Sequence, residues 1–413
     1  MSESIVATHY IDSDPDTIEE NSKHPTQPVM HRIVHDMNRK FLTGSDATGF
    51  TARFQEGLGE LCMGKKELIG DNWVLEEDLY TFFRHDLTST VINAVFGTSI
   101  LKLNPTFLAD FWTFSDNLTV FMVRVPRCLA WRVYNARDRL LSGMKKWQEW
   151  ANTQSNNVEM DKYGDEICWG SSFFKERYDI MSRLKGFDPV SMAAQELSFL
   201  YALNANAIIA TFWCALEVFK NPSLLEAVRE EVQSCTIPNQ PLKFDTQRLL
   251  NMPHLQAIYA ETLRIRGHGV FIRKADRDVQ FHDHVVQKGT ITISSSTPGH
   301  FNPDVWSKNQ YPPVDVFWAG RFLKQDGDKV QFSKGGVEGS WLPFGGGWNM
   351  CPGKRFAKLQ AIVTVAMLVT QFDIDVLASG RGIKMSMKSF GVGILGPSGK
   401  VPVRIRRRSN GTT

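Results

Sequence analysis

Residues 344–353 read FGGGWNMCPG, and this stretch decides the fold because a lone cysteine follows three glycines and precedes a predicted apolar helix over 354–372. A phosphate-binding loop is excluded by spacing, since Gly353-Lys354 is followed by Arg355 instead of Ser or Thr. Glycines let a backbone approach a flat ligand where a Cβ would clash. A cysteine just before a helix favours its thiolate form. A buried, inert thiol is the default for a cysteine taken alone, but this loop indicates a metal thiolate at Cys351.

The other cysteines leave Cys351 without a partner. The chain has six cysteines, none in a C-x-x-C pair, and the closest two, Cys214 and Cys235, are 21 residues apart. This spacing excludes a structural zinc site of the usual kind and argues against a disulfide framework. A single protein thiolate suits an iron that a macrocycle already holds through four nitrogens, which is haem.

The cysteine loop resembles the haem-binding loop of cytochromes P450, Phe-x-x-Gly-x-(His/Arg)-x-Cys-x-Gly. Phe344, Gly347, Cys351 and Gly353 match at the required spacing. The resemblance implies haem b, with Cys351 as the axial ligand of its iron and the other three residues around the cofactor. The basic position of the motif is Asn349 here, which removes one expected contact to a haem propionate.

Two further motifs support the resemblance. Glu261-Thr262-Leu263-Arg264 is similar to the Glu-x-x-Arg of the family, although a solvated pair three residues apart is the ordinary reading of such a spacing. Arg321, in the stretch VFWAGRF, matches the arginine that completes a buried triad with Glu261 and Arg264 in the family. A buried charge cluster requires every member to be paired. Arg273 lies where the family often has a propionate-binding arginine.

A long uncharged stretch requires a test for a membrane span. Residues 197–216 carry no charge and are long enough to cross a bilayer. Asn204 and Asn206 would then lie near the bilayer centre without evident partners, at a cost. A helix that is apolar on all sides is also typical of the core of a large protein. We expect a buried central helix, with a helical membrane protein as the disfavoured alternative.

The same stretch departs from the family where protons are usually delivered. In the resemblance, Ala205 and Asn206 take the positions of the catalytic acid and threonine that relay protons to dioxygen. The neighbouring sequence, with Thr211, is similar to the branch of sterol hydroxylases and prostacyclin synthase, whose central helix carries a similar asparagine. Those two activities differ, so the departure leaves the reaction open between oxygen insertion and isomerisation.

The candidate substrate pocket is apolar, in keeping with an aromatic content of 11%. Its expected lining comes from the central helix, the segment after the Glu-x-x-Arg helix and the C-terminal tail: Asn204, Thr211, Val270, Phe271, Val392 and Ile394.

The overall pattern predicts one mainly α domain with a small β part over residues 29–408, between a polar segment 1–28 and a tail 409–413. Strands are expected within 269–281, 284–294 and 389–408, where β-branched residues alternate with polar ones. A net charge of +3 gives no support to a nucleic-acid groove.

The N-terminal region departs from the family. Residues 1–30 are polar and acidic, so the usual anchor, first helices and first strands are not visible, and we expect an uncovered sheet edge. The segment 29–41 resembles the helix that crosses a haem propionate, with Arg32 and His35 as the contacts.

The resemblance implies a monomeric monooxygenase that hydroxylates an apolar small molecule, such as a sterol, terpenoid or polyketide, in secondary metabolism. Its partners would be dioxygen and an NADPH-dependent reductase, and its expected location the endoplasmic reticulum membrane. The alternatives are a haem-thiolate isomerase or dehydratase that needs no redox partner, and an inactive, truncated haem binder.

Overall fold

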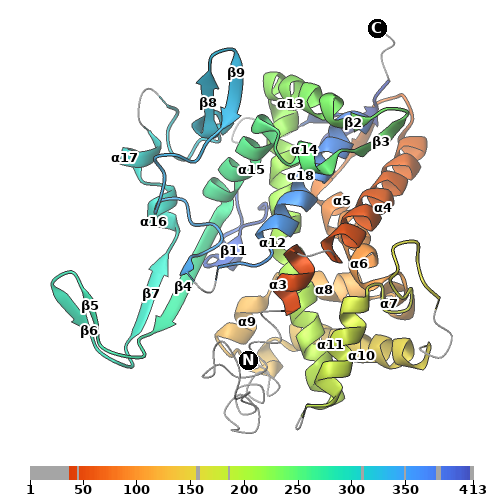
Figure 1. The fold of residues 1–413 in the computed structure, drawn as a ribbon, viewed down its shortest axis with the longest axis vertical. Helices are drawn as coiled ribbons and strands as arrows, with labels where there is room; N and C mark the ends of the chain where they lie inside the picture. The colour runs from red at the N-terminus through yellow and green to blue at the C-terminus, as the bar shows by residue number, and fades with distance from the viewer. Residues whose placement is uncertain are drawn as a thin grey trace.

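The computed structural model describes residues 37–43, 46–154, 159–184, 187–307, 311–347, 350–377 and 383–409. Most of these residues are helical, which confirms the predicted mainly α class, and Figure 1 shows the helices gathered in one block with an extended β arm beside them. The longer helices are α4 (Asp46–Ile69), α6 (Thr88–Phe96), α8 (Phe107–Ser115), α10 (Trp131–Thr153), α11 (Ser172–Ser182), α12 (Pro189–Lys220), α13 (Pro222–Cys235), α15 (Pro253–Arg266) and α18 (Lys354–Gln371).

Short helical segments connect these elements. They are α3 (Asn38–Thr43), α5 (Leu79–Phe82), the π-helix η3 (Phe83–Leu87), α7 (Ser99–Leu103), α9 (Leu118–Met122), η4 (Arg127–Leu129), α14 (Thr246–Leu249), α16 (Thr297–His300), α17 (Pro303–Trp306), η6 (Ala319–Phe322) and η8 (Met387–Ser389).

The central helix α12 contains the uncharged stretch and organises the core. It begins at Pro189, where the Asp188 side chain accepts a hydrogen bond from the Ser191 N–H and so caps the first turn. It packs against α18, α10 and α15. Within the described ranges this is the one helix long and apolar enough to span a membrane, and 78% of its most apolar window is buried. The expected buried central helix is therefore confirmed.

Two three-stranded antiparallel sheets flank the helices. One has the order β1 (Val74–Glu76), β12 (Val403–Arg407), β10 (Phe372–Val376), and the other the order β11 (Val392–Ile394), β4 (Gly267–Lys274), β7 (Ile291–Ser295). Three two-stranded sheets complete the β part: β2 (Thr236–Ile237) with β3 (Gln240–Phe244), β5 (Val279–Phe281) with β6 (His284–Val286), and β8 (Leu323–Asp326) with β9 (Lys329–Phe332).

The tail contains strands within the expected range 389–408, but its two strands, β11 and β12, lie in different sheets. β11 pairs with β4, whereas β12 pairs with β1 and β10. The connection is held along its length, because Leu395 N–H donates to the Arg266 carbonyl and Leu79 N–H donates to the Val401 carbonyl. These contacts draw the two strands apart.

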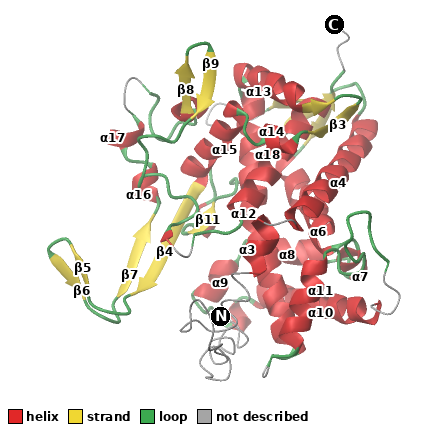
Figure 2. Cartoon of the chain, viewed as in Figure 1, coloured by secondary structure: helices red, strands yellow, loops and turns green. Residues whose placement is uncertain are grey.

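The arm formed by β4, β7, β5 and β6 projects from the helical block, as Figure 2 shows with its strands in yellow. β7 is an outer strand of its sheet among the described residues, and Ile291 and Ile293 are exposed. The inner end of the arm is different: Gly267 and His268 are buried. This end of β4, together with β11, reaches the centre of the molecule.

Candidate active site

A cavity of about 330 Å³ lies between α12 and the cysteine loop. One wall is a single face of α12 that includes Asn206 and Ala210, and the opposite wall holds Cys351. Val270, Phe271, Val392 and Ile394 line it from β4 and β11, as does Phe344 from the loop. The cavity thus gathers residues around one thiol from α3, α12, α15, β4, β11, the cysteine loop and the start of α18.

The glycines give the cysteine loop its course. Gly345 and Gly347 have φ angles of 70° and 68°, which residues with a Cβ rarely adopt. A Cβ built on Gly345 would lie 3.2 Å from the Phe271 ring, so the loop packs tightly against β4. The Cys351 N–H donates to the Phe344 carbonyl at 3.0 Å and closes the loop. The thiol is thereby held on the cavity wall, three residues before α18.

Opposing influences act on the pKa of the Cys351 thiol. Burial raises the pKa of its thiol, while the Gly353 backbone N–H and Lys354 act in the opposite direction. In the described part of the chain, no three His, Cys, Asp or Glu side chains gather closely enough to hold a bare metal ion. The Cys351 thiol is therefore not part of a site for a bare metal ion, and it fits a metal that carries its own equatorial ligands.

Two orphaned polar atoms on the cavity wall also fit a bound group. The Tyr259 hydroxyl and His268 Nε2 are buried and have no hydrogen-bond partner within the described residues, and both residues line the cavity. Buried polar atoms are normally satisfied by protein, water or ligand. Their position beside Cys351 fits a cofactor with polar atoms at its edge, as haem has.

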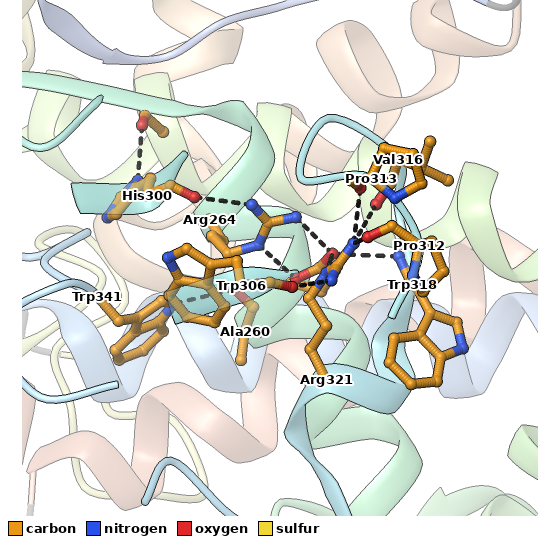
Figure 3. A network of polar contacts seen from close by, with 12 residues as sticks. Ala260, Arg264, His300, Trp306, Pro312, Pro313, Val316, Trp318, Arg321 and Trp341 are labelled. Atoms are coloured by element: carbon orange, nitrogen blue, oxygen red, sulfur yellow. Dashed lines mark hydrogen bonds and ion pairs between the residues drawn. The ribbon is translucent and has the colours of Figure 1, made fainter. Parts of the chain in front are cut away.

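A buried ionic cluster brings the three predicted triad residues together, and Figure 3 labels its two arginines, Arg264 and Arg321. Arg264 donates through Nε to Glu261 Oε2 at 2.7 Å and through Nη2 to Oε1 at 2.8 Å, and Arg321 Nε donates to Oε1 at 3.1 Å. Glu261 and Arg264 are 0% exposed and Arg321 is 8% exposed. The remaining donors of Arg321 bond to backbone carbonyls of Trp306, Pro312, Pro313 and Val316.

The cluster fixes the segment that leads into the cysteine loop. The Trp318 N–H donates to Glu261 Oε1 at 3.1 Å, and Trp341 Nε1 donates to the Ala260 carbonyl at 3.1 Å. Because Trp341 lies three residues before Phe344, α15 is tied to the start of the loop. The buried charges thus position the backbone that carries Cys351.

His300 links the cluster to the loop and was not predicted from the sequence. Its carbonyl accepts from Arg264 Nη1 at 2.7 Å. Its ring bonds the Gly267 carbonyl through Nδ1 at 3.1 Å and the Leu342 N–H through Nε2 at 3.0 Å, so the partners assign a neutral ring with its proton on Nδ1. Burial lowers the pKa of His300 to about 4, and Arg264 contributes in the same direction.

We expect this histidine to make the protein sensitive to acid. In the unfolded state the ring takes up a proton near the ordinary histidine pKa of 6.5, and in the folded state only near 4, so stability is complete above about pH 6.5 and falls toward pH 4. Between these two pH values the free energy of unfolding is expected to fall by up to about 3 kcal/mol because of His300. Urea unfolding at pH 7.5 and pH 4.5 measures it. His300→Gln keeps a donor and an acceptor but does not titrate, and should show a smaller pH effect. An equal effect in both proteins would contradict this role.

Asn206 fastens α12 to β11. Its Oδ1 accepts a hydrogen bond from the Ile394 N–H at 2.8 Å, across 188 residues of sequence. A Cβ built on Gly393 would lie 2.1 Å from the same oxygen, and Gly393 has a φ angle of 150°, so this approach requires glycine. About two turns further along α12, Trp213 Nε1 donates to the Leu395 carbonyl at 2.8 Å. The Asn206 side-chain oxygen is therefore committed to the backbone.

Three residues of the predicted site lie off the main cavity. Asn204 and Thr211 are fully buried and donate to the carbonyls of Leu200 and Ala207 in their own helix. Neither lines the cavity, because a helix turns about 100° per residue and both lie well round from Asn206. Ala205 lines a neighbouring cavity instead. The pocket assignment of Asn204 and Thr211 is corrected accordingly.

Of the expected propionate contacts, the one that lies within the described residues, Arg273, does not reach the cavity. Arg273 lies on the exposed outer half of β4, where its Nη1 donates to the Ile272 carbonyl, and it does not line the cavity. Arg32, His35 and Asn349 lie outside the described residues. Gly353 does line the cavity, next to Cys351.

Comparisons with known proteins agree with this geometry. The family model described as Cytochrome P450 matches residues 21–403. The chain is 30% identical to "Cytochrome P450 monooxygenase efuG" of Hormonema carpetanum, over 92% of this chain and 72% of that protein. It is 24% identical to "Cytochrome P450 7A1" of Oryctolagus cuniculus, over 88% and 73%. It is 26% identical to "25-hydroxycholesterol 7-alpha-hydroxylase" of Rattus norvegicus, over 58% and 59%.

Proposed function

Because the chain belongs to the cytochrome P450 family of oxidoreductases, we propose that it is a haem-thiolate monooxygenase that hydroxylates an apolar small molecule. A sterol, terpenoid or polyketide of secondary metabolism is the substrate class, and NADPH supplies electrons through a separate reductase. The observation that carries the proposal is the position of Cys351, alone on the wall of a largely apolar cavity that α12 closes from the other side. The sterol hydroxylase among the relatives supports an apolar substrate.

In this proposal the cysteine loop binds the cofactor, and α12 forms the opposite wall of the substrate pocket. Cys351 would hold the haem iron through its thiolate, and Phe344, Gly347 and Gly353 would shape the loop around the cofactor. When bound, the haem iron supplies the activation of dioxygen. The apolar side chains of β4 and β11 exclude water and hold the substrate against α12. Glu261, Arg264 and Arg321 keep the loop in register with α15.

The test of this proposal is the absorption spectrum of the reduced, CO-bound protein, followed by turnover with a reductase. A thiolate-ligated haem is expected to give a red-shifted CO band, and product formation is expected to depend on NADPH. A protein that takes up haem without this band would contradict thiolate ligation. A band without NADPH-dependent product would contradict the monooxygenase.

At the two positions where the family usually has its proton relay, this chain offers only an amide. Ala205 has no proton to give, and Asn206 Oδ1 accepts from Ile394, so Asn206 Nδ2 is the donor that these two positions supply. An amide does not lose a proton readily at neutral pH, and delivery therefore passes through water held by this group. We expect appreciable uncoupling of NADPH use from product formation.

Asn206→Thr is expected to raise the amount of product per NADPH by about twofold, because a hydroxyl relays protons better than an amide. The measurement is product formed against NADPH consumed, for the wild type and the variant. Asn204→Thr is the matched control, because Asn204 lies on the same helix but away from the cavity. Unchanged coupling in Asn206→Thr would mean that Asn206 serves only to fasten α12 to β11.

The same asparagine favours a second candidate, a haem-thiolate isomerase or dehydratase. Such a reaction rearranges oxygen already present in the substrate and needs no proton relay to dioxygen, so Ala205 and Asn206 would be no handicap. Full turnover without NADPH or reductase would support it. Under this candidate Asn206→Thr lowers the rate by disturbing substrate orientation.

Location at the endoplasmic reticulum membrane is part of the proposal. The buried α12 is not the expected attachment, because its residues pack inside the fold. Protease mapping that placed Glu196 and Glu217 on opposite sides of a bilayer would contradict this, since both side chains are buried in the same helix.

A further inference from the structure

A second cavity, of about 370 Å³, adjoins the first at the point where α12 meets β11. The two cavities share Asn206, Val392 and Ile394 in their walls. The lining of the second is mainly polar, whereas that of the first is mainly apolar. The contact of Asn206 with Gly393 and Ile394 lies between the two cavities, so a molecule that occupied both would cross this contact from apolar into polar surroundings.

Two tyrosine hydroxyls face this polar cavity without a hydrogen-bond partner among the described residues. Tyr80, on α5, is only 8% exposed, and its hydroxyl lies 3.3 Å from a Cβ built on Gly396 in the cavity wall. Tyr201, on α12, lines the opposite side. Burial raises the pKa of both hydroxyls, that of Tyr201 to about 12, so both keep their protons. Each hydroxyl can therefore donate a hydrogen bond to an acceptor atom of a ligand.

The charges at the cavity favour an anion. Among the described lining residues, the charged ones are Arg84, Lys388 and Asp116. Arg84 Nη2 donates to Asp116 Oδ2 at 2.7 Å, and its guanidinium stands 4.7 Å from the Trp112 ring centre, which holds it in place. Lys388, on η8, adds a second cation at the mouth. The balance is one positive charge, matched by a single negative charge on a ligand.

We propose that this cavity is a subsite for a carboxylate carried by the substrate at the end remote from the oxidised carbon. The inference rests on the proposed function, because it assumes that the apolar part of the same molecule lies against Cys351. Tyr80 and Tyr201 donate hydrogen bonds to the carboxylate, and the positive charges of Arg84 and Lys388 attract it electrostatically. The substrate class is thereby narrowed to apolar acids.

The test is isothermal titration calorimetry of the haem-loaded protein with three acids and their methyl esters: 5β-cholan-24-oic, abietic and palmitic acid. Each pair shares one skeleton and differs in charge. At least one acid is expected to bind about tenfold more tightly than its ester. If no acid binds more tightly than its ester, the subsite is overturned.

Variants separate a carboxylate contact from a structural effect. Tyr80→Phe and Lys388→Gln are each expected to weaken binding of the acid by about threefold or more, with the ester unchanged. Asp116→Asn removes the competing negative charge and is expected to tighten binding of the acid. Tyr178→Phe and Lys384→Gln, whose parent residues do not line the cavity, are the matched controls and should change neither affinity. Equal losses for acid and ester in Tyr80→Phe and Lys388→Gln would overturn the subsite.

The CO spectrum of the same preparation distinguishes failure of the carboxylate subsite from failure of the proposed monooxygenase function. A thiolate-type band together with no preference for any acid overturns the subsite and leaves the monooxygenase standing. A missing band contradicts the proposed function, and the calorimetric preference for the acids then still decides the subsite.

Discussion

Cys351→Ser is expected to abolish the red-shifted CO band and all oxygen chemistry, the largest effect of any single substitution in this chain. Serine is nearly the size of cysteine, so the loop geometry set by Gly345 and Gly347 is expected to survive. Its hydroxyl is neutral at pH 7 and is a poor donor to iron, whereas a thiol provides the thiolate that the metal binds. The measurement is the reduced CO spectrum together with haem content.

Cys128→Ser is the matched control for this experiment. Cys128 is exposed on the surface in η4, whereas Cys351 opens into the cavity, which Cys128 does not line. The control is expected to keep the wild-type band. A red-shifted band that persisted in Cys351→Ser would show that another cysteine is the ligand. It would contradict the assignment of residues 344–353 as the haem-binding loop.

Local motifs carried most of what the sequence predicted. The cysteine loop is recognisable because its glycines and cysteine lie within ten residues, and the Glu261–Arg264 part of the triad because these two residues are one helical turn apart. α12 is recognisable because a long uncharged stretch has few alternatives. Each of these signals is short in sequence, so neither long-range pairing nor side-chain packing was needed to find it.

The features that could not be predicted from the sequence depend on contacts between segments that lie far apart in the chain. The fastening of Asn206 to Ile394 spans 188 residues, and only the absence of a Cβ at Gly393 permits it. His300 acts through partners on β4 and on the segment just before the cysteine loop, so no pattern around it in sequence points to its role. The separation of β11 and β12 into two sheets likewise depends on where their connection is held.

One error was avoidable from the sequence. Asn204 and Asn206 differ by two positions, which on a helix is about 200° of rotation, so one cavity face does not readily hold both. Asn206 lines the cavity, and Asn204 is buried on another face. Helical phase, applied residue by residue, would have removed Asn204 from the predicted pocket and kept Asn206.

Glu261→Ala is expected to destabilise the fold by about 3–5 kcal/mol, because it leaves two arginines in a buried site without their counter-charge. Arg264 loses both of its carboxylate contacts, and Arg321 keeps only carbonyl partners. The Trp318 N–H loses its acceptor as well. Since these contacts hold the segment before the cysteine loop, the expected product is insoluble or haem-free protein.

The control for the triad is a glutamate paired on the surface. Glu149 lies 3.7 Å from Lys145 within α10, and its side chain is 59% exposed, so Glu149→Ala is expected to change stability by less than about 1 kcal/mol. Haem occupancy and thermal melting are measured for both variants. If Glu261→Ala bound haem at wild-type occupancy and melted at the wild-type temperature, the three charges would not act as one structural unit. The contrast between the two glutamates follows from burial, because the surrounding water compensates only the exposed charge.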